Sequence, residues 1–169
     1  MATAVNSGRY THAHTGDVTV FLIGMRFGKP LRVSKWWPVF TAMPPMLRHL
    51  ATDPNSGMLA YHLWPGRTTL MLTYWRSPDH LMAFASDTAA PHLEPWRRFN
   101  QRIGSDPSVG VWHETYQCHP GDYEAIYVNM PAFGLGKAAG VQAVGKGTAT
   151  ARQRLRSQQA DVSVAPVAP

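Results

Sequence analysis

The sequence predicts an α+β fold of the ferredoxin-like type, with the order β-α-β-β-α-β and one added C-terminal strand. Two observations support this prediction. Segments rich in β-branched and aromatic residues alternate with segments whose apolar residues recur at helical spacing, and two of the strands follow each other as a hairpin between helices. A chain of 169 residues is long enough for one such domain and its hydrophobic core.

The first strand is predicted over Val18–Phe27, which is apolar on both faces and ends at Gly28. The segment after it has the apolar stripe of an amphipathic helix. The residues of this stripe are Trp36, Phe40, Met43, Leu47 and Leu50. Because a proline lacks the amide donor and clashes with the preceding turn, Pro44-Pro45 is expected to kink or split the helix.

The middle of the chain predicts a hairpin and then a second helix. The two strands of the hairpin are Met58–Trp64 and Thr68–Trp75, and the short turn at Pro65-Gly66 joins them. Ser77 suits the N-cap of the helix that follows, with Pro78 in its first turn.

A further helix is predicted over residues 93–103, followed by a strand at Val109–Cys118. A turn containing Pro120-Gly121 then leads to the added strand, Tyr123–Met130. Strands that are apolar on both faces cannot leave one face of a sheet in water. We therefore expect a homodimer that packs sheet against sheet.

The two ends of the chain are expected to lie outside the folded domain, which we place at residues 18–136. Residues 1–17 are expected to be flexible, and residues 137–169 to form a basic, disordered tail. The tail has five basic residues and one acidic residue, so it carries +4 of the net charge of +6. A solvated tail explains this charge more simply than phosphate binding, and we expect no nucleic-acid partner.

Cysteine content and hydropathy indicate the compartment. The single cysteine, Cys118, allows no intramolecular disulfide and no cysteine-based zinc site. No run of apolar residues reaches the length of about 18 that a membrane span needs. The sequence therefore predicts a cytoplasmic protein with no membrane partner.

His113 is the most informative polar residue, because it lies in the middle of an apolar strand. Alternation along the strand places His113 and Glu114 on opposite faces, so they cannot act as a pair. The imidazole is either a metal ligand or a base in a cavity between sheet and helices, or a core histidine bonded to a backbone carbonyl. The residues alone favour the core interpretation.

Aromatic residues supply a second candidate feature. Trp37, Phe40, Trp75 and Trp96 could line an apolar pocket for a planar ligand, with Arg76 among the arginines at its mouth. A core with arginines at its edge explains the same residues. The chain has no nucleophile elbow, phosphate-binding loop or dinucleotide-binding fingerprint.

Several motifs taken together resemble a known family. They are Phe21-Leu-Ile-Gly-Met-Arg26, Ala42-Met-Pro-Pro45, Tyr74-Trp-Arg76, Trp96-Arg-Arg-Phe-Asn100, Gly110-Val-Trp-His-Glu-Thr-Tyr116 and Tyr127-Val-Asn-Met-Pro131. Together they resemble the monooxygenase-like family, long known as a domain of unknown function, that includes a fungal fumagillin-pathway oxygenase. The resemblance covers about Val18 to Leu135 and implies a dimeric α+β barrel.

A second resemblance is local. His113-Glu114 and the segment Asn129-Met-Pro131 are similar to parts of the haem-containing aldoxime dehydratases. In that family the first histidine ligates the haem iron and a second histidine acts on the substrate. The resemblance implies that His113 is the axial ligand of haem b, while Met130 stands where the second histidine would be.

The sequence therefore predicts a monooxygenase-like enzyme, or a haem-dependent lyase, that acts on a small hydrophobic molecule. The candidate catalytic residues are His113, Arg76, Tyr116 and Asn129, and the candidate substrate-binding residues are Trp37, Phe40, Trp75, Trp96 and Met130. Two alternatives stay open. One is a cofactor-free oxygenase of the antibiotic-biosynthesis type, in which His113 is a base, and the other is a non-catalytic module that binds a hydrophobic metabolite.

Overall fold

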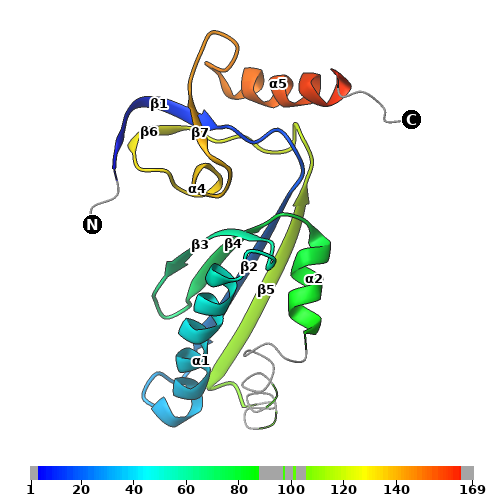
Figure 1. The fold of residues 1–169 in the computed structure, drawn as a ribbon. Coiled ribbons are helices and arrows are strands. Elements are labelled where there is room, and N and C mark those ends of the chain that lie inside the picture. The colour runs from blue at the N-terminus through cyan, green and yellow to red at the C-terminus, as the bar shows by residue number, and fades with distance from the viewer. Residues whose placement is uncertain (1–3, 88–96, 98–100, 102–105, 165–169) are drawn as a thin grey trace.

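The computed structural model describes residues 4–87, 97, 101 and 106–164, and these form two antiparallel sheets with helices (Figure 1). The strands are β1 (Asn6–His12), β2 (Val18–Phe27), β3 (Met58–Trp64), β4 (Leu70–Trp75), β5 (Val109–Cys118), β6 (Tyr127–Met130) and β7 (Val141–Ala143). The helices are α1 (Val33–Thr52), α2 (Pro78–Ser86), α4 (Leu135–Ala139) and α5 (Ala151–Val164).

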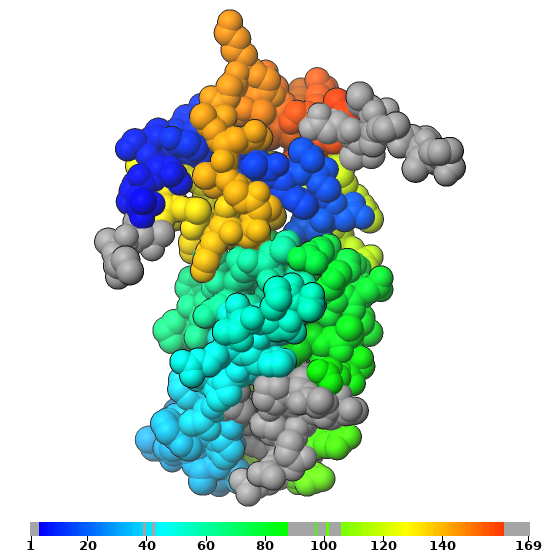
Figure 2. Space-filling view, viewed as in Figure 1, coloured from blue at the N-terminus to red at the C-terminus, as the bar shows by residue number. Residues whose placement is uncertain are grey.

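The first sheet confirms the ferredoxin-like prediction. Its strands lie in the order β3-β4-β2-β5 and all neighbours are antiparallel. Helices α1 and α2 cover one face of this sheet, as Figures 1 and 2 show. Strands β2, β3 and β5 have the predicted bounds, while β4 begins at Leu70. The helix predicted over 93–103 falls largely outside the described residues.

Trp75 organises the core between this sheet and its helices. Its side chain is 1% exposed and packs with Leu50 of α1 and Leu81 of α2. Its indole N–H donates to Thr73 Oγ1 at 2.8 Å, so burial leaves no unpaired donor on the ring. A smaller cluster joins Met25 of β2 to Val109 of β5, with Trp36 of α1 packed against it.

Helix α1 is not split at its prolines, contrary to one of the two expected outcomes. It continues from Val33 to Thr52 with Pro38, Pro44 and Pro45 inside. The carbonyls that Pro44 and Pro45 leave without an amide partner belong to Phe40 and Thr41. Both residues are exposed, so water can satisfy these carbonyls and the helix survives.

The expected flexible N-terminus is wrong for residues 6–12, because β1 is the central strand of the second sheet, in the order β6-β1-β7. The added C-terminal strand also differs from the prediction. It is confined to Tyr127–Met130 and pairs with β1 instead of extending the first sheet. Tyr10 of β1 is opposite Tyr127 on one side and Ala143 on the other, and pairing over such separations has no local sequence signal.

The expected disordered tail is also wrong over 151–164, which forms helix α5. Two polar side chains of this helix, Arg154 and Gln158, are 5% and 4% exposed. Composition indicated disorder because the segment has few apolar residues, but buried polar contacts hold the helix in place. Within the described residues, no helix is both long and apolar enough to cross a membrane.

Candidate functional site

His113 lies in the middle of β5, opposite Ile23 of β2, and its side chain is on the face of the sheet that carries the helices. Its ring centroid is 5.8 Å from that of Phe21, which packs against the Trp75 core. The residue is exposed, so it is not the core histidine of the alternative interpretation. Among the described residues its ring contact is with Phe21, and no hydrogen bond occupies its nitrogens.

An aromatic surface lies on the same side of the sheet, toward the Val109 end of β5. Trp36 packs against the Met25 and Val109 cluster, and its indole N–H donates to the carbonyl of Pro30 at 2.8 Å. Trp37 and Phe40 are stacked, with ring centroids 6.1 Å apart, and are 52% and 45% exposed. Two predicted substrate-binding residues therefore present accessible aromatic rings on α1, a helix that covers the face carrying His113.

Asp106, near this end of the sheet, is held by hydrogen bonds and two cations. Asp106 accepts hydrogen bonds from the hydroxyl and the amide of Ser108, at 2.6 and 3.0 Å. Arg32 and Lys35 lie 3.8 and 3.7 Å from its other oxygen. The hydrogen bonds from Ser108, and then the two cations, lower the pKa of Asp106. Asp106 is therefore a stable anion and a poor proton acceptor at neutral pH.

Two predicted substrate-binding tryptophans do not join this surface. Trp75 is a core residue, because its 1% exposure leaves no surface for a ligand. Its single polar atom is satisfied by Thr73. Trp96 lies outside the described residues.

Arg76 and Tyr116 are not brought to His113. Met71 is level with His113 across the sheet, and Arg76 is five positions further along, about 16 Å at the rise of a strand. Tyr116 is on the opposite face, where its hydroxyl donates to Glu114 Oε2 at 2.7 Å. This hydrogen bond raises the pKa of Tyr116.

Asn129 and Met130 lie in β6 of the second sheet, away from His113. Asn129 has a φ of 52°, and its Oδ1 accepts the amide of Gly8 at 2.8 Å, next to an irregularity in the pairing of β1 with β6. This contact gives the asparagine a structural role at the bulge. Met130 is opposite Asn6 and is 39% exposed.

The described residues meet only part of what a haem site needs. The His113 imidazole has no described hydrogen-bond partner, so a nitrogen is free to ligate iron. Asn129 and Met130, the predicted counterparts on the other side of the iron, lie in a different sheet. No group of three or more His, Cys, Asp or Glu side chains in the described part of the chain could hold a metal ion.

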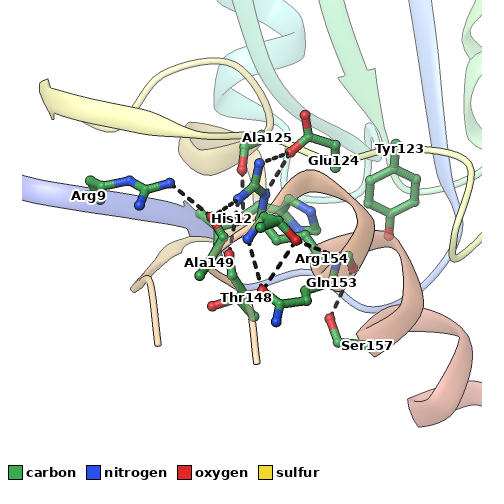
Figure 3. A network of polar contacts seen from close by, with 12 residues as sticks. Arg9, His12, Tyr123, Glu124, Ala125, Thr148, Ala149, Gln153, Arg154 and Ser157 are labelled. Carbon is green, nitrogen blue, oxygen red and sulfur yellow. Dashed lines mark hydrogen bonds and ion pairs between the residues drawn. The ribbon is translucent and has the colours of Figure 1, made fainter. Parts of the chain in front are cut away.

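Sequence reasoning missed a buried polar network between the two ends of the chain, which Figure 3 shows. Arg154 of α5 binds Glu124 through Nε at 2.7 Å and Nη2 at 2.6 Å, and also donates to the carbonyl of Thr148. Gln158 reaches His12 of β1. The β-branched and aromatic residues Tyr10 and Thr11 beside His12 were the available signal for a strand there.

The strand order of the first sheet, with α1 and α2 on one face, defines an α+β protein of the ferredoxin-like class. Within that class, the family model described as "Monooxygenase af470-like" matches residues 18–135, so the chain belongs to the monooxygenase af470-like family. This finding confirms the first of the two resemblances. It does not support the second, to haem-containing aldoxime dehydratases.

A curated relative is monooxygenase af470 of Aspergillus fumigatus strain Af293, which is 30% identical over 133 residues. The match covers 72% of this chain and 46% of that protein, so the chain spans less than half the length of its relative.

Two solved structures are also similar to the chain. A conserved protein from Methanosarcina mazei Go1 has 12% identity and a TM-score of 0.41, covering 59% of this chain and 91% of that one. A protein from Shewanella oneidensis has 12% identity and a TM-score of 0.40, covering 69% of this chain and 97% of that one.

Proposed function

We propose that the chain is a monooxygenase-like oxidoreductase that acts on a small hydrophobic molecule at the helix-covered face of the first sheet. Family membership supports the reaction class. The observation that carries the site is His113, an exposed imidazole beside Phe21 on the same side of the sheet as the rings of Trp37 and Phe40. We propose that the active form is a homodimer.

His113 can act as a general base, since a neutral imidazole accepts a proton near pH 7. A phenol that gives its proton to His113 becomes an electron-rich phenolate that can react with O2. One oxygen atom then enters the ring, which becomes a quinone, and the other leaves as water. The phenol supplies all the electrons, so this version needs no further reductant. The aromatic rings of Trp37 and Phe40 suit a flat, apolar substrate of this kind.

Haem ligation by His113 stays a second prediction, beside its role as a general base. Haem would supply an open iron position for oxygen, peroxide or a nitrogenous substrate, and the imidazole of His113 would be the residue that holds it. Titration of the purified protein with haem tests it directly. A Soret band near 400 nm in the wild type that is lost in His113→Ala would support ligation.

The proposed function is tested by incubating the purified protein with 18O2 and a panel of phenols, and by following labelled products by mass spectrometry. We expect one labelled oxygen atom per product molecule. His113→Ala should lower kcat by about 100-fold or more, because a positioned base contributes at least that much. His119→Ala is the matched control, since His119 is exposed and lies at the far end of β5 beside Asp17.

Equal turnover by wild type and His113→Ala would show that His113 is not the base. Tight binding of a panel member without any turnover would contradict an oxygenase and favour the non-catalytic binding module. Product carrying no label would exclude O2 as the source of the oxygen.

A further inference from the structure

The contact between α5 and the second sheet centres on a buried histidine. His12 is 3% exposed and lies at the end of β1. Its Nε2 is 3.1 Å from Nε2 of Gln158, and Gln158 is itself 4% exposed. Its Nδ1 is buried with no hydrogen-bond partner in the structure. One imidazole therefore has one occupied nitrogen and one unpaired nitrogen inside the protein.

The neighbours of Gln158 fix which way its amide points. Gly121 donates its backbone N–H to Oε1 at 3.0 Å, and the carbonyl of Tyr123 accepts from Nε2 at 2.9 Å. The oxygen must accept and the nitrogen must donate, so the amide cannot be turned round. The second N–H of Gln158 then points at His12 Nε2. His12 Nε2 is therefore the acceptor, and the proton of the neutral ring is on Nδ1.

Protonation of His12 would break this contact. A proton on Nε2 would place an N–H against the N–H of Gln158, so the hydrogen bond would become a contact between two donors. The charged ring would also be buried without an acceptor at Nδ1. The released state has neither penalty, because water can solvate both nitrogens. We propose that protonation of His12 in mild acid releases helix α5 from the second sheet.

The groups around His12 allow this response. Arg154 of α5 adds a cation on one side, while Glu124 and the ring of Tyr123, 5.2 Å away, come from the segment between β5 and β6. His14 follows on the chain after β1. Burial lowers the pKa of His12, and the charges of His14 and Arg154 act in the same direction, whereas the nearby backbone of His14 and the charge of Glu124 oppose it. His12 therefore binds a proton less tightly when α5 is docked than when α5 is released.

The sign of the pH effect follows from this difference. Docking is fully present above the ordinary histidine pKa of about 6.5 and weakens as pH falls from there toward the lowered pKa of docked His12. This window lies above the range in which carboxylates ordinarily titrate, so the Arg154 and Glu124 pair is not the group that responds first.

Hydrogen–deuterium exchange on the full chain tests the proposal. Protection of amides 151–164, corrected for intrinsic exchange, should fall by about tenfold per pH unit below pH 6.5 until docked His12 itself titrates. Peptides from β2 should keep their protection over the same range. Uniform loss of protection in both regions, or constant protection of α5 down to pH 5, would overturn the proposal.

Two variants separate His12 from the other histidines. His12→Gln places an amide oxygen where Nε2 accepts from Gln158 and cannot take up a proton, so α5 should lose its response to pH. His119→Gln removes an exposed imidazole that pairs with Asp17 at 3.1 Å, and should respond as the wild type does. A wild-type response in His12→Gln would assign the effect to another group.

A measurement on the wild type avoids the risk that the His12 variant does not fold. The 15N shifts of the imidazole at pH 7.5 should show a neutral His12 with its proton on Nδ1, the less common tautomer. A proton on Nε2, or a charged ring at that pH, would contradict the proposed contact.

Discussion

At the scale of single residues, Tyr123 has a strongly raised pKa. Its hydroxyl donates to the carbonyl of Gly16 at 2.5 Å, and its ring lies 5.2 Å from that of His12. Burial, followed by the charge of Asp17, raises the pKa of Tyr123 to about 12. Unfolded chains lose the phenolic proton near pH 10, so the stability from this group is present below pH 10 and is lost as pH rises through about 12.

We therefore expect the urea midpoint of the wild type to fall between pH 10 and 12, and to fall less steeply in Tyr123→Phe. Urea unfolding followed by circular dichroism at pH 9, 10 and 11 measures this slope. Tyr61→Phe is the control and should keep the wild-type slope. Identical slopes in all three proteins would show that Tyr123 is not responsible for the alkaline loss.

At the scale of elements, helix α2 shows a sequence signal that the structure confirms. Ser77 is the N-cap, its hydroxyl oxygen accepts the amide of His80, and Pro78 follows in the first turn. Removing the hydroxyl leaves that amide without its partner, so Ser77→Ala should cost about 1 kcal/mol of unfolding free energy. Ser86→Ala, at the other end of α2, should change it by less than about 0.5 kcal/mol. Equal losses in the two variants would mean that the cap is not the cause.

Local signals explain which elements could be predicted. Strands β2, β3 and β5 follow from their own composition, and the alternation along β5 separated His113 from Glu114 correctly. The second sheet could not be predicted in this way, because Tyr10 pairs with Tyr127 and Ala143 over more than 100 residues. Helix α5 could not be predicted for the same reason. Its buried residue Arg154 is paired with Glu124, which lies 30 positions away in the sequence.

In the candidate site, too, the features set by local sequence could be predicted, and those set by long-range pairing could not. The side of the sheet on which His113 lies could be predicted from strand geometry, and so could the helical stripe that holds Phe40. The grouping of Asn129 with His113 came from similarity to another family over two short segments. It is not found, because β6 belongs to the sheet that β1 organises. Which strands share a sheet depends on long-range pairing, which a short motif does not encode.

At the scale of the whole molecule, α1 and α2 cover one face of the first sheet in the described part of the chain (Figure 1). Part of the other face is covered by the segment before α4, where the amide of Gly134 donates to His62 Nε2 at 3.0 Å and Phe133 packs on the His62 ring at 4.2 Å. The same face carries Trp112, whose indole lies so close to Gly24 that a Cβ there would be 2.5 Å from Nε1. That indole N–H is buried without a partner.

The exposed part of this face, along β5, is where a homodimer is expected to form. Tyr116 is on it, is 49% exposed, and lies at the edge strand β5, so Tyr116→Arg should place a charge in the interface without disturbing the core. Sedimentation at micromolar concentration should give twice the chain mass for the wild type and one chain mass for the variant. Met82→Arg is the control, because Met82 is 65% exposed on α2, a helix on the opposite side of the sheet, and should remain dimeric. A wild-type mass of one chain would contradict the dimer, and a dimeric Tyr116→Arg would place its interface on another surface.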